Sequence, residues 1–582
     1  MQINEIRVGV SSCGLAAGAQ DVLNLLKERT DVPVLGVGCI GHCYAEPLVE
    51  VITDAGSLLF RNIQGTTKDI DAVLSLNTKN NPEKQLHIRS ERTSRENLRI
   101  TGLIGKSEPV DIDAYVSFGG FDGLKKALRM APESVVDEVK QSQLRGRGGG
   151  GFSTGVKWSL LAAKSSGDKV IICNGDEGDP GAFMDRSLME SLPYQVLEGM
   201  LIAAHATGAT KLFIYCRAEY PLAIRNIRIA IDKVRELQLN AIGGTPLDIE
   251  VKEGAGAFVC GEETALIHSL EGKRGMPRFR PPYPTDSGYH GLPSMISNVE
   301  TFANVPVILR DGAASFSSVG TAGGRGTKLF ALAGDIKYPG LVEVPMGITL
   351  GEIIYEIGGA EPGSVKAVQT GGPSGGCIPA SLFDTPVDYD SLNSLGAIMG
   401  SGGLIVIGNN RCMVETARYF LDFTHRESCG KCTFCRVGAK RMFETLEQIT
   451  AGDGTKDDIA FLEDMGRKVK AGSLCGLGAT APNPVLATLR YFRSEFEAHV
   501  VDKQCPALEC AALCDVTIDK ALCTECKLCL KNCALNAISE DYVVDNDICT
   551  RCNSCIESCA QDAIARVKAG QGYRGSVERE VG

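Results

Sequence analysis

The apolar and polar positions of the first 76 residues predict a small α/β domain. Short apolar runs of the kind found in strands alternate with one segment of helical periodicity. The expected strands span residues 6–10, 32–37, 48–52 and 57–60, and the expected helix spans residues 21–28. Polar and charged segments beginning at Asn77 and Arg89 then predict a linker over residues 77–114.

The remainder of the chain divides into four further parts. A glycine-rich region at residues 115–327 carries strand-like runs at 169–173, 211–215 and 247–251 and an amphipathic helical run at 222–239, which predicts an α/β core. Short β-like runs with many glycines follow at residues 328–408, then a cysteine-bearing helical region at 409–499 and a cysteine-rich tail at 500–582. The expected fold class is therefore multidomain α/β.

Composition excludes several classes of function. With 582 residues, 44% of them hydrophobic and 23% charged, the chain has the composition of a globular protein of several domains. A net charge of −11 argues against nucleic acid or an anionic membrane as the main partner. The longest apolar runs, such as 403–407, are too short to span a bilayer. No secretory signal is readable at the N-terminus, so we expect a cytoplasmic location.

Cysteine is the outlier of the composition, with 23 residues. In a large chain without an export signal, clustered thiols indicate metal ligands rather than disulfides. The tail contains the spacing Cys-x2-Cys-x2-Cys-x3-Cys twice, which is the pattern of two [4Fe–4S] clusters whose fourth ligands are exchanged. The expected sets are Cys523, Cys526, Cys529 and Cys559 for one cluster, and Cys549, Cys552, Cys555 and Cys533 for the other. Ala534 and Ala560 stand where proline usually follows, which removes no ligand.

A third cysteine triplet lies upstream of the tail. Cys429, Cys432 and Cys435, with Cys475 as the fourth ligand, predict another [4Fe–4S] cluster. A zinc ribbon is the alternative, although it more often shows two separated Cys-x2-Cys pairs.

The N-terminal domain has three cysteines where a thioredoxin-like [2Fe–2S] site needs four. Cys39 and Cys43 form the Cys-x3-Cys half, but the other half lacks a partner for Cys13, because Val8 and Gly18 occupy the positions five residues away. Imidazole replaces thiolate in some [2Fe–2S] centres, which makes His42 a possible ligand. Two alternatives stay open at this point: a cluster with an unusual ligand set, and a domain that has lost its cluster.

A zinc site is predicted in the segment that precedes the tail. His499, Cys505, Cys510 and Cys514 form a Cys3His set of the kind that holds a closed tetrahedral zinc ion. The alternative is a group of unligated thiols and a surface histidine. The remaining cysteines stand alone among apolar neighbours and are expected to be small buried hydrophobes; they are Cys173, Cys216, Cys260, Cys377 and Cys412.

Glycine-rich turns with polar residues indicate a site for a flavin and a nucleotide. The run from Gly146 to Phe152 precedes Lys157 and the only tryptophan, and consecutive glycines allow close approach of a phosphate or a ring. A helical stretch precedes this run, which disfavours a Rossmann fold. Three further segments supply groups that would hydrogen-bond flavin and ribose: Asn174, Asp176, Glu177, Glu262, Glu263 and Asn298.

The motifs GRGGGGF, CNGDEGDPGAF, FVCGEETAL and ESCGKCTFC resemble those of the flavoprotein subunit of complex I and of soluble NAD-linked hydrogenases and formate dehydrogenases. The N-terminal domain and the double-cluster tail look most like the β subunit of electron-bifurcating [FeFe]-hydrogenases. The resemblance implies a thioredoxin-like first domain and a β-grasp domain at 328–408. It also implies an FMN site at Gly146, Arg147, Gly148, Lys157, Asn174, Asp176, Gly261, Glu262, Glu263, Asn298 and Thr301, with Phe152, Glu177, Asp179, Glu263, Arg280 and Tyr283 near NADH.

The chain departs from the respiratory pattern at three positions. Asp179, Ser297 and Leu160 stand where the respiratory proteins have a glutamate, an asparagine and an aromatic residue. These changes fit the soluble branch of the family better.

The resemblance also implies a reaction and partners. The expected activity is reversible hydride transfer between NAD(H) and FMN, followed by single-electron transfer through three [4Fe–4S] clusters. The expected partners are a small [2Fe–2S] thioredoxin-like subunit, a hydrogenase catalytic subunit and ferredoxin, with electron bifurcation among them. An equivalent role in a formate dehydrogenase is one alternative, and a non-catalytic electron-relay scaffold is an alternative of another class.

Overall fold

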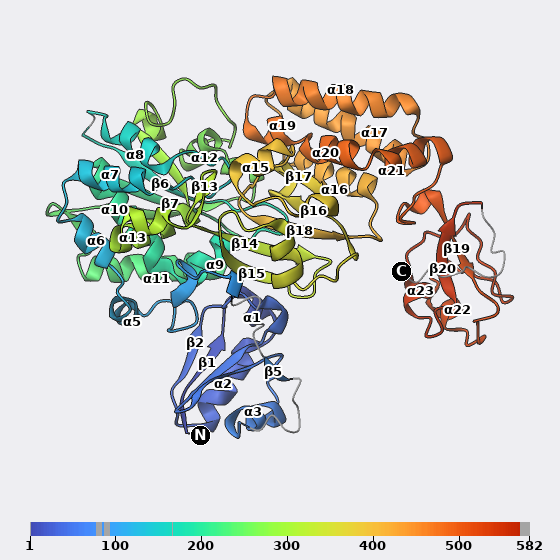
Figure 1. Cartoon of the computed structure of the whole chain (residues 1–582), viewed down its shortest axis with the longest axis horizontal. Coiled ribbons are helices and arrows are strands. Elements are labelled where there is room, and N and C mark those ends of the chain that lie inside the picture. The colour runs from blue at the N-terminus through green and yellow to red at the C-terminus, as the bar shows by residue number, and fades with distance from the viewer. Residues whose placement is uncertain (1, 77–83, 87–93, 166, 571–582) are drawn as a thin grey trace. The chain divides into compact units, whose positions relative to one another are not determined.

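The structure is a computed structural model that describes the chain apart from residues 1, 77–83, 87–93, 166 and 571–582. It forms two compact units (Figure 1). Unit 1 consists of Met1–Ile407 with Leu474–Leu477, and unit 2 of Gly408–Ser473 with Gly478–Gly582. Much of the predicted linker after Asn77 and Arg89 lies outside the described residues.

The first part of unit 1 is a five-stranded mixed sheet with strand order β2-β1-β3-β4-β5. Strand β1 pairs in parallel with β2 and antiparallel with β3. The strands and the main helix are β1 Ile3–Gly9, β2 Val34–Val37, β3 Val49–Thr53, β4 Gly56–Phe60, β5 Gln85–Leu86 and α2 Ala19–Arg29. The strand and helix predictions for this region are confirmed, because alternate residues such as Ile6 and Val8 are buried against α2 as the apolar pattern requires.

The second part of unit 1 is built on a four-stranded parallel sheet with strand order β10-β7-β6-β11. Its elements are β6 Val170–Gly175, β7 Lys211–Arg217, β10 Asp248–Gly254, β11 Ser294–Asn298, α8 Thr154–Ala162, α9 Met184–Ser191, α10 Pro193–Thr207, α11 Pro221–Glu236, α12 Glu263–Leu270 and α13 Val299–Asp311. Helices α10 and α13 are buried along nearly their whole length and pack against each other. Helix α11 keeps a polar face, as its amphipathic sequence predicts.

The third part of unit 1 is a mixed five-stranded sheet with strand order β15-β14-β18-β16-β17. Its strands are β14 Thr327–Gly334, β15 Gly340–Pro345, β16 Val365–Thr370, β17 Gly376–Pro379 and β18 Gly403–Gly408. Strands β14 and β15 form an antiparallel pair, whereas β14 and β18 run parallel. This part has its own hydrophobic core around Phe330, Val344 and Ile354.

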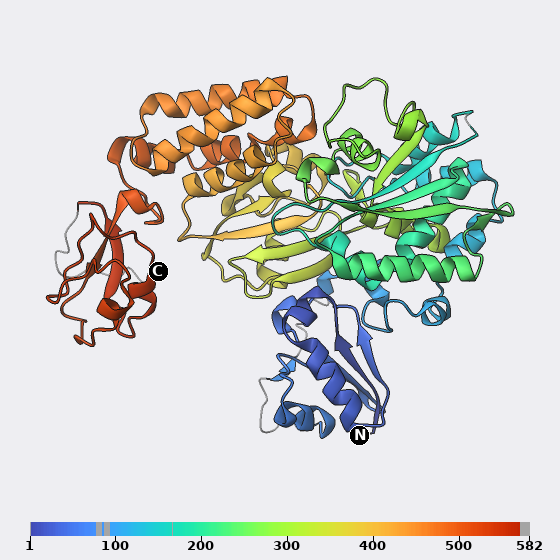
Figure 2. The same cartoon turned by 180° about the vertical axis from the view of Figure 1, so that it is seen from behind.

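Unit 2 begins with packed helices and ends in a small domain. The helices are α16 Met413–Arg426, α17 Lys440–Thr450, α18 Lys456–Gly472 and α20 Asn483–Tyr491; α16 packs on α17 and α20, and α18 packs on the same two helices (Figure 2). The small domain contains the antiparallel pair β19 Cys514–Ile518 and β20 Ile564–Lys568 and two short helices, α22 Leu528–Asn532 and α23 Ser554–Glu557. In the part of the chain that is described, no helix combines the length and the apolar character needed to cross a membrane.

Candidate functional site

The candidate flavin site lies at the carboxyl ends of two neighbouring parallel strands. Asn174 at the end of β6 pairs in register with Asn298 at the end of β11. Ligands of open α/β sheets bind beyond the carboxyl ends of the strands. The glycine run reaches the same place, because the backbone N–H of Arg147 donates to Thr301 Oγ1 at 2.8 Å, three residues after Asn298.

The glycine run is a tight loop that leaves its backbone accessible. The N–H of Gly146 donates to the carbonyl of Phe152 at 2.8 Å, which closes the loop. A Cβ at Gly148 would lie 3.0 Å from the Cβ of Asn298, and Gly149 adopts a φ of +118°, which residues with side chains avoid. As predicted, a helix, α7 (Pro132–Gln141), precedes this loop instead of the strand that a Rossmann fold would need.

The side chain of Arg147 is turned into the protein. It is fully buried, and its Nη2 donates to the carbonyl of Arg325 at 2.5 Å. A contact between Arg147 and a flavin would therefore come from its backbone, while the guanidinium fixes the loop against strand β13 (Gly324–Arg325).

Lys157 is held by acceptors from two different segments. Its Nζ donates to Glu263 Oε1 at 2.6 Å and to the carbonyl of Ile296 at 2.9 Å. The other oxygen of Glu263 lies 3.6 Å from Arg280 Nη1. Phe152 and Tyr283 are each more than half exposed, with the Phe152 ring centroid 5.9 Å from Lys157 Nζ. Five of the predicted residues thus come from three separate segments, and the two cations, Lys157 and Arg280, meet at Glu263.

Backbone contacts join the second and third predicted segments. Asn174 Nδ2 donates to the carbonyl of Gly261 at 2.9 Å, and its Oδ1 accepts from the N–H of Asp176 at 3.1 Å. Glu262 caps helix α12, since its carboxylate accepts from the N–H groups of Thr264 and Ala265 at 2.9 Å. The side chain of Glu262 therefore serves the helix start, which has a local stabilising role of its own.

The two acids predicted near NADH differ in their surroundings. The carboxylate of Glu177 accepts from the N–H groups of Asp185 and Arg186 at 3.0 Å, so it faces the first turn of α9. Asp179 accepts from Ser401 Oγ at 2.8 Å. Burial raises the pKa of Glu177, and burial raises the pKa of Asp179 to about 6, despite the Ser401 hydrogen bond that opposes the shift.

Sequence reasoning missed a layer of buried charge below this site. Asp185 accepts from Asn298 Nδ2 and from the N–H of Glu300. Glu300 pairs with Lys328, and both side chains are almost completely buried. Burial raises the pKa of Asp185 well above its usual range. Glu300 stands inside the segment ISNVET, which was the available signal, but its spacing does not reveal that a buried lysine from β14 reaches it.

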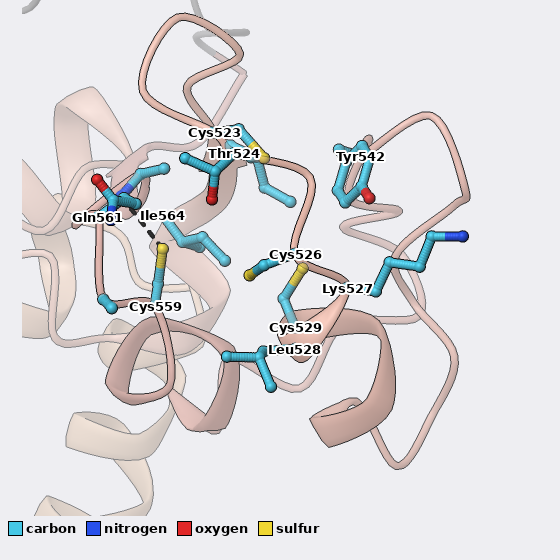
Figure 3. Close-up of a pocket in the computed structure, with 13 residues that line it drawn as sticks. Cys523, Thr524, Cys526, Lys527, Leu528, Cys529, Tyr542, Cys559, Gln561 and Ile564 are labelled. Carbon is cyan, nitrogen blue, oxygen red and sulfur yellow. Dashed lines mark hydrogen bonds between the residues drawn. The ribbon is translucent and has the colours of Figure 1, made fainter.

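The tail cysteines surround a cavity of about 170 Å³ (Figure 3). Four cysteines line it, and they are the four residues predicted for one cluster: Cys523, Cys526, Cys529 and Cys559. The first three belong to one loop and the start of α22, whereas Cys559 comes from the second repeat, after α23. The exchange of fourth ligands inferred from the spacing is thus matched by which side chains face this cavity.

Backbone hydrogen bonds to sulfur repeat in both halves of the tail. The N–H groups of Glu525 and Arg551 each donate to the sulfur two residues earlier, Cys523 and Cys549, at 3.4 Å. The N–H groups of Ala537 and Ala563 each donate to the sulfur four residues earlier, Cys533 and Cys559, at 3.2 and 3.4 Å. Such bonds to ligand sulfurs are one of the factors that set cluster potentials.

The third cysteine triplet, Cys429, Cys432 and Cys435, lies between helices α16 and α17 of unit 2. Ser428 Oγ lies 3.2 Å from Cys435 Sγ. A Cβ at Gly478 would lie 2.8 Å from the Cβ of Cys435, so the chain just after Cys475 runs close to the triplet. The ligand set Cys429, Cys432, Cys435 and Cys475 stays a prediction.

The predicted zinc set needs a correction in one ligand. His499, Cys505 and Cys510 converge with Cys412, and all four side chains are buried. The His499 Nε2 atom lies 3.4 Å from Cys412 Sγ and 3.3 Å from Cys510 Sγ, and these two sulfurs are 3.7 Å apart. Cys514 instead begins strand β19, where its Sγ lies 3.8 Å from the carbonyl of Ala511. The prediction that Cys412 is an isolated buried thiol was therefore wrong.

The geometry of this corrected set fits a tetrahedral zinc ion. A zinc ion bound by thiolates at about 2.3 Å holds its sulfurs about 3.8 Å apart. His499 Nδ1 lies 2.7 Å from the carbonyl of Glu495, which orients Nε2 toward the sulfurs. Hydrogen bonds from Cys412, Cys510 and His499 lower the pKa of Cys505, which favours the thiolate form that binds a metal.

The three N-terminal cysteines also converge. The Sγ atoms of Cys13, Cys39 and Cys43 lie within 4.8 Å of one another. Val8 is fully buried in the core of its domain, and His42 is buried near the thiols without belonging to the converging group.

Three family models match the chain. The Nuo51 FMN-binding domain matches residues 139–307, the SLBB domain residues 329–378, and the iron–sulfur binding region of NADH-ubiquinone oxidoreductase-F residues 415–499. The first match contains the glycine loop and the strand ends described above. The last contains the Cys429 triplet and Cys475.

Curated proteins and a solved structure are similar to much of the chain. NADP-reducing hydrogenase subunit HndC of Solidesulfovibrio fructosivorans is 52% identical over 77% of this chain and 92% of its own length. An F-type subunit of the NADH-quinone oxidoreductase of Rhizobium meliloti is 43% identical over 68% of this chain and 96% of its own length. A chain of the NAD⁺-reducing [NiFe]-hydrogenase in the H2-reduced state is 31% identical, with a TM-score of 0.63, covering 85% of this chain and 84% of that one.

These matches agree with the geometry of the candidate flavin site and of the cysteine-bearing helices. The FMN-binding model falls on the strand ends, and the four-iron model on the cysteine-bearing helices. The chain belongs to the family of NADH-binding flavoprotein subunits that includes the F-type subunits of NADH-quinone oxidoreductases, and it is an NADH dehydrogenase-type oxidoreductase subunit.

Proposed function

We propose that the chain oxidises NADH reversibly at the carboxyl ends of β6 and β11 and passes the electrons through three [4Fe–4S] clusters to partner proteins. FMN, when bound, supplies the acceptance of a hydride and the release of single electrons. The observation that carries the proposal is the convergence of the glycine loop, the strand ends and the Lys157–Glu263 pair.

The protein's own residues would position the cofactor and the nicotinamide. Accessible N–H groups of the glycine loop suit a phosphate or a ring edge, and Lys157 supplies a cation held in one place by Glu263 and Ile296. The exposed rings of Phe152 and Tyr283 offer apolar faces to a nicotinamide nucleotide. Under this proposal FMN is held mainly by a fixed backbone at Asn174, Asp176, Gly261, Asn298 and Thr301. Arg147 contributes by anchoring the glycine loop, because its N–H is bonded to Thr301 Oγ1.

We propose a hydrogenase-type complex as the setting of this reaction. Hydrogenase subunits are among the similar proteins. Cys526 and Cys552 of the tail are exposed, which suits electron exchange with an external carrier such as ferredoxin. On this view the complex also contains a small [2Fe–2S] subunit and bifurcates electrons among NADH, ferredoxin and hydrogenase, in the cytoplasm, where thiol ligands stay reduced. A thioredoxin-like first domain and a β-grasp third domain belong to the same proposal and are supported by their strand orders.

We further propose that Cys412, His499, Cys505 and Cys510 hold a structural zinc ion. The set is closed and buried, so no position remains for a substrate, as in structural rather than catalytic zinc sites.

The test of the flavin proposal compares two lysines near one helix. Lys157→Met removes the cation at Glu263, and Lys164→Met removes an exposed ion pair, 2.6 Å long, with Asp286. Flavin content and the rate of anaerobic reduction by NADH and by NADPH are measured for both variants. We expect Lys157→Met to lose most of its FMN or about tenfold or more of its reduction rate, the scale of a lost electrostatic contact, and Lys164→Met to match the wild type.

The scaffold alternative predicts a different result. A chain loaded with clusters that binds no flavin, or whose bound flavin stays oxidised in NADH and NADPH, would rule out the enzymatic proposal. Equal behaviour of the two lysine variants would remove the assigned role of Lys157. Faster reduction by NADPH than by NADH would support the flavin reaction but would assign NADPH as the hydride donor.

A further inference from the structure

The three N-terminal cysteines come from two segments that meet at one point. Cys13 lies in the first turn of α1 (Ser12–Ala16), and Cys39 and Cys43 lie in the loop after β2. Their sulfurs are all within 4.8 Å of one another. Cys39 is buried, and Cys13 and Cys43 are partly buried.

This convergence differs from the arrangement of cluster ligands elsewhere in the chain. The tail cysteines stand around a cavity of about 170 Å³, and no three of them, within the described residues, converge within the same 4.8 Å limit. The Cys412 set does converge, and two of its sulfurs are 3.7 Å apart. A two-iron cluster divides its ligands between two metal ions, so some ligand pairs must be separated by the whole cluster. Three mutually close sulfurs fit the ligand spacing of a single ion.

A carboxylate stands beside the three sulfurs. Glu46 is 8% exposed, and its Oε1 lies 3.9 Å from Cys13 Sγ. Its Oε2 accepts from the N–H of Leu48 at 2.8 Å, which fixes the carboxylate in this direction. A carboxylate buried beside three thiols loses its hydration, and a bound cation would offset that cost. Glu46 lies outside the group that converges within 4.8 Å, but its 3.9 Å contact with Cys13 Sγ makes it the candidate for a fourth ligand.

We infer that Cys13, Cys39, Cys43 and Glu46 bind one zinc ion, in place of the two-iron cluster that a four-cysteine domain of this type would hold. Zinc takes sulfur and carboxylate ligands in a tetrahedral set. To act as the fourth ligand, the Glu46 carboxylate would move closer to the sulfurs than its present 3.9 Å contact with Cys13 Sγ. This inference does not depend on the flavin reaction, because it concerns only the ligand set of the first domain.

The zinc ion would lock the contacts of the first domain with the second and third parts of unit 1. Ser12, next to Cys13, donates from its N–H to Glu190 of α9 at 3.0 Å. The carbonyl of Gly41, between Cys39 and Cys43, accepts from the N–H of Leu341 of β15 at 3.0 Å. A metal that joins Cys13 to the two later cysteines ties both contacts together. The first domain would then be a fixed support for α9. The first turn of α9 donates to Glu177, and Asp185 of α9 accepts from Glu300.

The first test needs no variant. The purified chain is analysed for zinc, iron and acid-labile sulfide, and its zinc is examined by X-ray absorption. We expect about two zinc ions per chain, each with about three sulfur neighbours and one nitrogen or oxygen. About one zinc ion per chain would mean that only the Cys412 set is filled, and it would overturn the inference.

Variants assign the second zinc ion to its ligands. Cys43→Ser should lower zinc by about one ion per chain and leave iron, sulfide and flavin unchanged. Glu46→Gln keeps the shape and the acceptor for Leu48, and it should weaken zinc retention against a chelator at least tenfold. Cys377→Ser, a buried cysteine that contacts Gln369, is the matched control and should retain all metals. Loss of about two irons and two sulfides from Cys43→Ser, with zinc unchanged, would establish a [2Fe–2S] cluster instead.

A last measurement separates the metal from a folding failure. Hydrogen exchange of the wild-type chain, before and after zinc removal by a chelator, should show faster exchange in α1, in the loop at 38–46 and in α9 together. Faster exchange spread evenly over unit 1 would contradict a local lock, and unchanged exchange would contradict a role at this contact.

Discussion

Two regions of this chain use the same residue type in opposite ways. In the tail, cysteines stand apart around a cavity, with Cys526 and Cys552 open to solvent. At the Cys412 set, cysteines and a histidine meet at one point and are fully buried. The first arrangement fits a bulky inorganic cluster that exchanges electrons with the outside. The second fits a single ion that holds segments together. Spacing in the sequence distinguishes the two only in part, because convergence depends on the fold.

The largest effect should come from a ligand of the tail. Cys526→Ser removes one of the four sulfurs of the cavity, and we expect the loss of about four irons per chain, with the second tail cluster retained. Thr524 lines the same cavity but offers no thiolate, so the Thr524→Ala variant should keep all of its iron. Electron paramagnetic resonance of the reduced protein identifies which signal disappears. If Cys533→Ser abolished the same signal as Cys526→Ser, the proposed exchange of fourth ligands would be wrong.

The second prediction separates the two cysteines that compete for the zinc set. Cys412→Ser should lose about one zinc ion and destabilise unit 2 by roughly 4 kcal/mol, the scale expected when a metal site is lost. Cys514→Ser should retain the zinc and most of the stability, because its sulfur lies near a carbonyl at the start of β19. Zinc analysis and thermal unfolding decide between them. Loss of zinc from Cys514→Ser alone would restore the set inferred from the sequence.

The third prediction tests Asp179, a partly buried acid near the candidate nicotinamide site. The pKa of Asp179 is raised by burial from 3.8 to about 6, so the folded protein binds this proton more tightly than the unfolded chain does. Its ionised form therefore lowers stability above pH 6, and this cost disappears as the pH falls toward 4. Asp179→Asn should raise the free energy of unfolding by roughly 1 kcal/mol at pH 8 and by less at pH 5.

Unfolding of Asp179→Asn and the wild type is followed at both pH values in parallel. Ser401→Ala, which removes the hydrogen-bond donor to Asp179, should move stability in the opposite direction at pH 8. An equal gain for Asp179→Asn at both pH values would show that its charge is not the cause.

The smallest effect concerns the hydrogen bonds to sulfur in the tail. Ala537→Pro and Ala563→Pro each remove one N–H donor, to Cys533 and Cys559 respectively. Each change should lower the reduction potential of one cluster and leave the iron content unchanged. Ala560→Pro, at the position where proline usually follows the cysteine, is the control and should leave the potential in place. Redox titration of each variant shows whether the two halves of the tail respond separately.

The elements of the fold were largely predictable from the apolar pattern. The strands at 6–10, 48–52 and 169–173 occur within a few residues of the predicted bounds, because one or both faces of each strand are buried. Local spacing also predicts the two sets of tail ligands, since each loop supplies three neighbouring cysteines. The four side chains of one predicted set line a common cavity. Local signals of this kind survive folding because they lie within one turn or one strand.

The parts that sequence reasoning missed depend on distant segments. Cys412 lies 87 residues before His499, and its apolar neighbours make it indistinguishable from a core thiol. Lys328 and Glu300 form a buried pair across 28 residues, and no periodic pattern marks either residue. The same holds for the side chain of Arg147, which the glycine-rich sequence suggests should face a ligand and which the fold turns inward.

The place of Cys412 in the chain has a consequence for the order of folding. Cys412 and Cys510 are 98 residues apart, and the helices α16 to α20 lie between them. A zinc ion that joins them closes a long loop, so it removes much conformational freedom from the unfolded chain. During synthesis the closure must wait until Cys510 has left the ribosome, by which time these helices have all emerged. Under the zinc proposal the ion would therefore close this loop after the helices have emerged, and a chain truncated before Cys505 would lack it.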